Sequence, residues 1–203
     1  MDLSKGILIA SSNKGKIKEI THILDGIKGI RLVLLSEIHK HGFDVEEHGK
    51  TFQDNALIKA RAYAEKFGYV ALADDSGLEV EYLNGAPGIN SARYAGENAT
   101  DEERVKKLIG ELKDVPATKR KARFKCVVCL YDPISGDKIF AEGVCAGLIT
   151  NAPSGNNGFG YDPIFVPDGY KCTMAELLPE QKNSISHRGR ALQELKENLL
   201  HLK

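Results

Sequence analysis

Two adjacent carboxylates, Asp74 and Asp75, follow an apolar stretch and are the residues of this chain best suited to chemistry. Residues 69–73 have the length and flanks of a β-strand, and Ser76-Gly77 is expected to turn the chain after the acids. Like charges side by side cost free energy unless a cation or hydrogen-bond donors offset them. A hard divalent cation is a suitable partner; a solvated acidic turn is the alternative that this segment leaves open.

A short polar segment near the start of the chain has the composition of a phosphate-binding turn. Residues 6–10 are predicted to form a buried strand, and Ile17, Ile20 and Leu24 recur after the turn at helical spacing. A strand that passes through small polar residues into a helix offers backbone N–H groups and a positive dipole end to an anion. The turn is not a Walker loop, because the G-x-x-x-x-G-K-[ST] signature is absent. Its six residues are Ser11, Ser12, Asn13, Lys14, Gly15 and Lys16.

Further polar residues surround the start of a second predicted helix, residues 51–67. Asn55 and Lys59 are four residues apart and therefore share one face of this helix. Glu46 and Glu47 offer carboxylates in the loop before it. A solvated helix start is the alternative interpretation of these residues.

Two later segments could recognise an aromatic ring or an anion. In the glycine-rich loop 153–161, glycines flank Phe159, which frees the backbone to approach a ligand and leaves a ring on which a base can stack. A buried core phenylalanine is the alternative. Lys182, His187 and Arg188 place three cations at the start of the final helix.

Several other elements must position these residues. Their order interleaves helices and strands, so the class is mixed α/β; a β-loop-α-β opening favours parallel pairing with a right-handed crossover. Apolar periodicity and turn residues predict strands at residues 31–35, 123–131 and 138–150. A Thr100/Glu103 capping box predicts a helix that begins at Thr100. A last helix is predicted from near Ser186, and it buries Leu192, Leu195 and Leu199.

Composition excludes several classes of function. The 28 Lys and Arg residues balance 28 Asp and Glu residues, so no net basic field recruits nucleic acid. No apolar stretch is long enough for a membrane span or a signal-peptide core, which predicts a soluble, cytoplasmic protein. Cys126 and Cys129 lie three apart on a predicted strand and so face opposite sides; we expect buried thiols, not a metal site. Residues 119–121 are expected to form a solvated basic loop.

Five ordered segments together resemble the inosine triphosphate pyrophosphatase family: SSNKGKIKEI, EEHGKTFQDNALIKA, ADDSGLEVEYLNGAPGINSARYAG, NNGFGYDPIF and QKNSISHRGRAL. They cover nearly the whole chain. The resemblance implies a single domain, an elongated mixed α/β structure with a central sheet flanked by helices and two lobes with the active cleft between them. It implies Mg²⁺-dependent hydrolysis of ITP, dITP and XTP to the monophosphate and pyrophosphate, by a homodimer.

The resemblance also assigns roles to residues. Asp75 is expected to be catalytic and a metal ligand, and Glu47 a second ligand, with Glu46 left as an alternative. Lys182, His187 and Arg188 would read the base through the oxygen at C6, which adenine lacks. The residues expected to bind the phosphates are Ser11, Ser12, Asn13, Lys14, Gly15, Lys16, Asn55 and Lys59. Ser76 is expected to touch the substrate. The residues expected to surround the purine are Phe159, Gly160, Tyr161 and Asp162.

The chemistry of such a site can be argued from the residues. A water attacks the α-phosphorus, and pyrophosphate leaves with its charge neutralised by lysines and metal. The sequence leaves open whether Asp75 orients this water or takes its proton. Two alternative functions are a pyrophosphatase acting on modified pyrimidine nucleotides and a nucleotide-sensing module. The acids at positions 74 and 75 argue against the sensing module. An apolar loop at residues 83–89 is the expected subunit contact.

Overall fold

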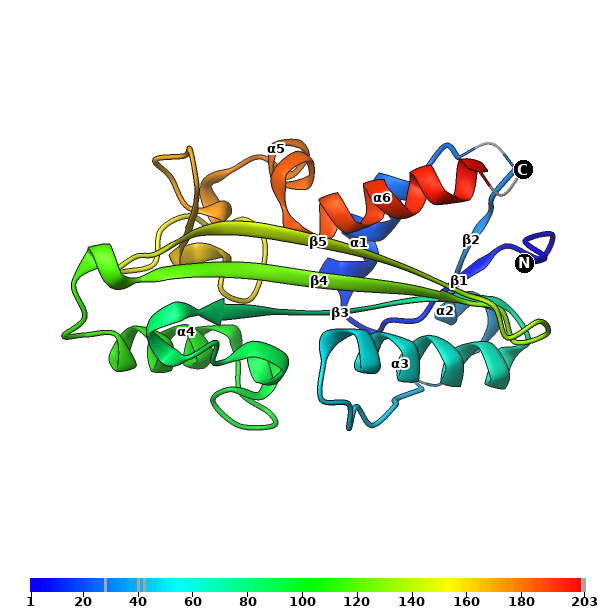
Figure 1. Cartoon of the computed structure of the whole chain (residues 1–203), viewed down its shortest axis with the longest axis horizontal. Coiled ribbons are helices and arrows are strands. Elements are labelled where there is room, and N and C mark those ends of the chain that lie inside the picture. The colour runs from blue at the N-terminus through cyan, green and yellow to red at the C-terminus, as the bar shows by residue number, and fades with distance from the viewer. Residues whose placement is uncertain (28, 40, 42, 202–203) are drawn as a thin grey trace. The chain divides into compact units, whose positions relative to one another are not determined.

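The computed structural model describes residues 1–27, 29–39, 41 and 43–201, and contains a six-stranded sheet with helices packed against it (Figure 1). The strand order is β2-β1-β3-β4-β5-β6. The sheet is mixed, because β1 pairs in parallel with β2 and β3 whereas β6 pairs antiparallel to β5. The strands are β1 (Ile7–Ile9), β2 (Leu32–Leu34), β3 (Val70–Val80), β4 (Lys121–Tyr131), β5 (Lys138–Ile149) and β6 (Phe165–Pro167).

The α-helices of the described residues are α1 (Lys14–Leu24), α2 (Leu35–Ile38), α3 (Phe52–Phe67), α4 (Asp101–Glu111), α5 (Pro179–Ile185) and α6 (His187–His201). None of them is both long and apolar enough to pass through a bilayer. The mixed α/β class and the principal helices and strands predicted from the sequence are confirmed. The short strand β6 and helix α5 were not predicted, since three and seven residues carry too little periodicity to be recognised.

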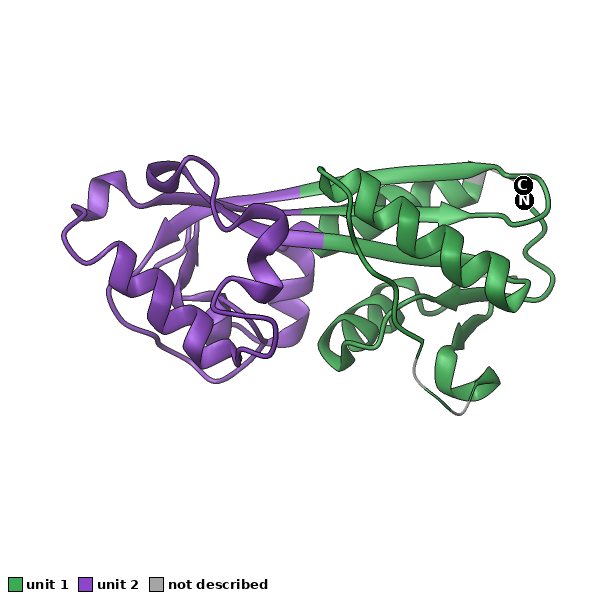
Figure 2. Ribbon diagram, turned by 90° about the horizontal axis from the view of Figure 1, so that it is seen from below, with its two compact units in different colours: residues 1–75, 126–143, 188–203 green, residues 76–125, 144–187 purple. Residues whose placement is uncertain are grey.

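The chain forms two compact units (Figure 2). Unit 1 comprises residues 1–75, 126–143 and 188–203. Its core joins apolar side chains of β1, β3 and β4 to those of α1 and α6, among them Leu192, Leu195 and Leu199 as predicted. Helix α3 lies on the other side of these strands (Figure 1). Cys126 and Cys129 are buried on β4 and form no disulfide, as expected for apolar core residues.

Local signals explain where the unit 1 helices begin and end. Asn13 caps α1, its side chain accepting the N–H of Lys16 at 3.0 Å. Thr51 caps α3 in a capping box with Asp54. Gly68, with φ +70°, ends α3 in the left-handed conformation that favours glycine.

Unit 2 comprises residues 76–125 and 144–187. Its core includes Leu108 and Leu112 of the α4 segment, Phe124 of β4 and Phe165 of β6. The capping box predicted at the start of α4 is present: Thr100 Oγ1 accepts the N–H of Glu103 at 3.2 Å, and Glu103 Oε2 accepts the N–H of Thr100 at 2.7 Å.

The prediction that the chain turns at Ser76-Gly77 is wrong. Strand β3 continues without interruption through both acids to Val80. The continuation follows from Leu78 and Val80, which are fully buried in the core of unit 2, and from the N–H of Leu78, which donates to Ser91 Oγ at 2.9 Å. The two acids are therefore strand residues, not residues of a solvated turn.

The prediction that residues 119–121 form a solvated basic loop is only partly correct. Lys119 and Lys121 are exposed, but Arg120 is buried. Its guanidinium donates to the carbonyls of Leu112 at 2.7 Å and Val115 at 2.9 Å. These carbonyls follow the C-terminus of α4, where backbone acceptors lack intrahelical partners. Arg120 is therefore a structural cation.

Candidate active site

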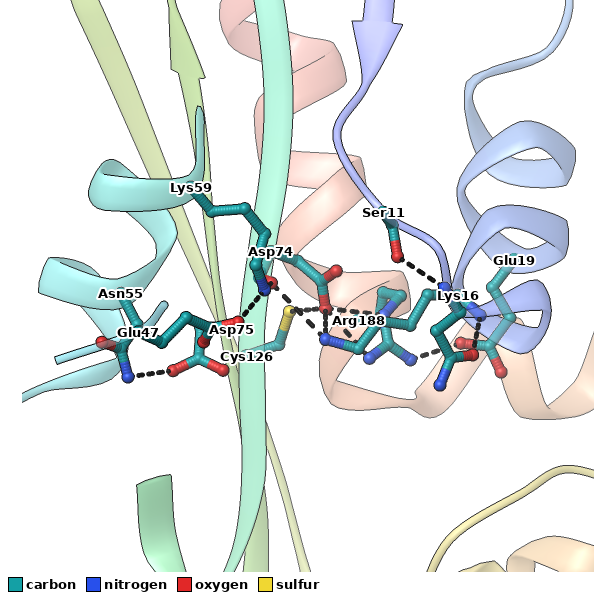
Figure 3. Close-up of polar contacts among 11 residues, drawn as sticks. Ser11, Lys16, Glu19, Glu47, Asn55, Lys59, Asp74, Asp75, Cys126 and Arg188 are labelled. Atoms are coloured by element: carbon teal, nitrogen blue, oxygen red, sulfur yellow. Dashed lines mark hydrogen bonds and ion pairs between the residues drawn. The ribbon is translucent and has the colours of Figure 1, made fainter. Parts of the chain in front are cut away.

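The two acids of β3 face opposite sides of the strand. Successive side chains of a strand alternate, and Figure 3 shows Asp74 directed toward Lys16 and Arg188 while Asp75 is directed toward Asn55. The adjacent carboxylates singled out in the sequence thus take different partners, which removes most of the repulsion that adjacency implied.

Asp74 is the anionic centre of a buried network. Its Oδ2 lies 3.1 Å from Lys16 Nζ and accepts hydrogen bonds from Arg188 Nε at 3.1 Å and Nη2 at 3.0 Å. Arg188 also donates to Glu19 Oε2 at 2.6 Å. Burial by itself would raise the pKa of Asp74, but the charges of Lys16, Arg188 and Lys59 outweigh it and hold the pKa below its usual value.

Asp75 has the opposite electrostatic character. Its Oδ2 accepts a hydrogen bond from Asn55 Nδ2 at 3.0 Å. Burial raises its pKa; the charge of Lys16 opposes this and the charge of Glu47 adds to it, so that the pKa reaches about 6. The charged form of Asp75 is thus less stabilised by its surroundings than that of Asp74.

Glu47 lies in the loop before α3 and contacts the helix. Its Oε1 is 2.5 Å from Lys59 Nζ, which also donates to the backbone oxygen of Asp74 at 3.5 Å. Burial opposes the charge of Lys59, but the nearby carboxylates, Glu47 first, raise its pKa overall. Glu46 is exposed whereas Glu47 is half-buried, so the geometry favours Glu47 as the functional acid of this loop.

The residues around β3 fit a divalent cation shared with a ligand. The charged groups of this cluster comprise three cations and four anions: Lys16, Lys59, Arg188, Glu19, Glu47, Asp74 and Asp75. No set of three or more Asp, Glu, His or Cys side chains within the described residues could hold a metal ion alone. Mg²⁺ is commonly held by one or two carboxylates and substrate phosphates, and Glu47 and Asp75 are the acids of this cluster whose chemistry suits that role.

The predicted phosphate-binding turn does lead into a helix N-terminus. Ser11 Oγ accepts the N–H of Asn13 at 3.2 Å, and Asn13 in turn caps α1. Ser12 and Lys14 are exposed, and Gly15 lies in the first turn of α1. The N–H groups of a first helical turn lack intrahelical acceptors, so this turn retains donors for an anion.

The predicted purine-framing residues lie in unit 2 and are held in place by hydrogen bonds. Asp162 Oδ2 accepts the N–H of Phe159 at 2.9 Å and the ammonium of Lys182 at 2.6 Å. Lys182 Nζ lies 4.8 Å from the centroid of the half-buried Phe159 ring. Tyr161 is buried in the core, where its hydroxyl donates to the carbonyl of Ser91 at 3.0 Å. The Phe159 ring is therefore the member of this group best placed to meet a base.

The consecutive residues His187 and Arg188 have different partners. His187 belongs to unit 2, and its ring stacks on Phe124 with the centroids 4.7 Å apart. Arg188 belongs to unit 1 and bonds to the acids described above. Ser76, half-buried on β3, begins unit 2. That His187 and Arg188 read a base, and that Ser76 touches substrate, stay predictions.

One charged residue of the network, Glu19, is absent from the residues predicted above. It lies three residues after Lys16 on α1, and both side chains are only partly exposed. Residues three apart share a helix face. An acid three residues after Lys16 was therefore the sequence signal that could have identified Glu19.

The chain is similar to known proteins over nearly its whole length. A dITP/XTP pyrophosphatase of Clostridium perfringens is 51% identical over 96% of this chain and 97% of its own. A protein of the same name from Geobacter sulfurreducens is 49% identical over 95% and 96%. The solved structure of a HAM1 protein from Coxiella burnetii matches with a TM-score of 0.86 at 44% identity, covering 97% of this chain and 98% of that one.

A second solved structure, the Ham1 protein of Staphylococcus aureus, matches with a TM-score of 0.85 at 43% identity over 98% of this chain and 100% of that one. The family model described as the Ham1 family matches residues 7–198. This range contains the acids of β3, the turn before α1 and the glycine-rich loop, and the chain is a member of the Ham1 family.

Proposed function

We propose that this protein hydrolyses dITP, XTP and ITP to the monophosphate and pyrophosphate. The observation that carries the proposal is the environment of Asp75: a buried carboxylate held by Asn55, beside Glu47 and within the field of two lysines. Relatives that are about half identical over nearly their whole length bear the name dITP/XTP pyrophosphatase. No observation favours the pyrimidine alternative.

In this reaction the residues of unit 1 would bind and orient the triphosphate. The first turn of α1 offers N–H groups and Lys14, while Lys16 and Lys59 neutralise charge on the phosphates. Asp75 orients the water that attacks the α-phosphorus, and Asn55 fixes the carboxylate for that task. The bond between the α-phosphorus and the oxygen that bridges to the β-phosphate breaks, so pyrophosphate leaves as a single group, and the proton of the attacking water passes to solvent.

Glu47 and Asp75 would hold Mg²⁺. When bound, this ion would neutralise charge that develops on the phosphate oxygens and lower the pKa of the attacking water. The charge of Glu47 acts on Asp75 and raises its pKa after burial, and a bound cation would offset the repulsion between the two carboxylates.

Base selection would use unit 2. The Phe159 ring offers a stacking surface, and Lys182 and His187 are cations or donors that suit an acceptor oxygen at C6 of hypoxanthine or xanthine. Adenine presents an amino donor at that position. A site built to bond one group can reject an analogue that lacks it by about 10⁴-fold.

A substrate panel tests the proposal. Purified protein with Mg²⁺ is given dITP, XTP, ITP, ATP, GTP and modified pyrimidine triphosphates, and pyrophosphate and orthophosphate are measured separately. We expect pyrophosphate from the first three. Release of orthophosphate, a preference for pyrimidines, or ATP turnover equal to that of ITP would contradict the proposal, and binding without turnover would indicate a sensor.

A further inference from the structure

The first residue of α4 is bonded to the glycine-rich loop. Asp101 Oδ2 accepts the N–H of Gly160 at 2.7 Å, across 59 residues of sequence. Its other oxygen, Oδ1, is paired with the guanidinium of Arg104. Arg104 is itself held by the carbonyls of Ala92 at 2.5 Å and Ala99 at 2.9 Å. The Asp101 carboxylate is thus fixed at both oxygens, one of which is dedicated to the loop.

Asp101 is not needed to cap its own helix. Thr100 is the N-cap, and Glu103 completes the capping box. An acid in the first turn also interacts favourably with the helix dipole, but Glu102 and Glu103 supply that charge as well. What Asp101 adds is therefore the bond to Gly160, with its other oxygen held by Arg104.

Each of three consecutive loop residues is held by a different segment. Phe159 is bonded through its N–H to Asp162, Gly160 to Asp101, and Tyr161 through its hydroxyl to Ser91. Ordering one residue of a flexible chain costs conformational entropy. Glycine is the most costly residue to order, and Gly160 has a φ of +64°. Bonds that order the loop before a ligand arrives remove this cost from binding.

We propose that Asp101 is a positioning residue that orders the loop around Phe159 for the base of the substrate. It acts through the N–H of Gly160 and touches no substrate atom itself. The proposal rests on the proposed function in one respect, which is that this loop meets the purine. Loss of the bond should weaken binding of the base and leave the chemistry at Asp75 intact.

Kinetics of three variants test this role. Asp101→Ala removes the bond, and we expect KM for dITP and XTP to rise about 10-fold, the effect of losing one charge-assisted hydrogen bond, with kcat within about 2-fold of wild type. Asp101→Asn keeps an oxygen that can accept the Gly160 N–H and should recover most of the affinity. Glu103→Ala is the matched control, because it removes an acid and a cap from the same helical turn without a bond to the loop.

Backbone hydrogen exchange at Gly160, measured by NMR without nucleotide, tests the bond independently of activity. We expect exchange at least about 5-fold faster in Asp101→Ala than in wild type or Glu103→Ala, since the open state of the loop becomes more populated. Unchanged exchange, or an equal change in Glu103→Ala, would overturn the proposal. Faster exchange with an unchanged KM in a protein that hydrolyses dITP would overturn it too. A wild-type protein that hydrolyses no purine triphosphate would instead refute the proposed function, while the exchange data would still report the bond.

Discussion

Asn55 donates from Nδ2 to Asp75 Oδ2 over 3.0 Å, and both side chains are buried. The oxygen of the same amide accepts the N–H of Gly49 at 2.8 Å, which determines the orientation of the amide. A Cβ atom at residue 49 would overlap this oxygen, so only glycine fits without a shift. One amide of α3 therefore fixes the strand acid relative to the loop that carries Glu47.

Replacing Asp75 with Asn tests the role of its charge. The amide keeps the shape of the side chain, and its oxygen can still accept from Asn55, but the charge that would hold metal and orient water is lost. We expect kcat for dITP to fall about 10²–10³-fold, the usual loss when one electrostatic contribution to a transition state is removed. The unfolding midpoint should stay near that of wild type, and near-normal turnover at saturating Mg²⁺ would exclude Asp75 from the mechanism.

Two neighbouring substitutions test the metal assignment. Glu47→Gln removes a carboxylate whose charge reaches Asp75, so we expect the Mg²⁺ concentration for half-maximal activity to rise at least about 10-fold. Glu46→Gln is the matched control, because Glu46 precedes it in the same loop and is exposed. Mg²⁺ titrations of dITP hydrolysis give both values. A larger shift for Glu46→Gln would reverse the assignment.

The sequence identified most elements because their periodicity and caps are local. Thr51 and Thr100 cap helices by bonding to residues three positions on, and such signals are legible in a single chain. The continuation of β3 was missed because Asp-Asp-Ser-Gly has the composition of a turn. This segment is a strand because residues distant in the sequence bury it. Arg188, for example, lies 114 positions from Asp74, and the sequence around Asp74 does not identify it as a partner.

The candidate site shows the same limit. Asp75, Lys16 and Lys59 could be selected by type and spacing, and the structure brings them together. The different environments of Asp74 and Asp75 could not be predicted, since they depend on which partners lie on each side of the strand. In the sequence, Asp101 is only an acidic residue at the start of a helix. Its bond to Gly160 depends on tertiary packing and could not be predicted.

Removing Arg188 should destabilise the protein because Asp74 would lose its main hydrogen-bond donor. Breaking a buried ion pair on one side costs about 3–5 kcal/mol, so we expect Arg188→Ala to lower the free energy of unfolding in urea by about 3 kcal/mol. Arg61→Ala is the control, since its pair with Glu65 is exposed and should contribute little to stability. A fully stable Arg188→Ala protein with an altered ratio of ITP to ATP turnover would assign Arg188 to base reading instead.

We propose that the protein works as a homodimer, with the loop at residues 83–89 at the contact. Leu83 and Ile89 are half-buried, and the neighbouring Tyr82 is 52% exposed, so apolar surface is available there. Light scattering at assay concentration should give a dimer, the usual form of symmetric soluble oligomers, and Tyr82→Glu should shift it toward monomer with loss of activity. A fully active wild-type monomer would contradict both parts of the proposal.

Purine binding should depend on a glycine at position 158. Its φ is +78°, and a Cβ atom there would overlap Asp162 Oδ2, the acceptor for both Phe159 and Lys182. We expect Gly158→Ala to displace this carboxylate and raise KM for dITP about 10-fold, as for one lost charge-assisted bond. Gly136→Ala is the control: its φ is +75°, but a Cβ atom there meets nothing within 4 Å. Both variants should lose about 1 kcal/mol of stability through left-handed strain, and an equal KM for the two would show that Asp162 does not set the loop.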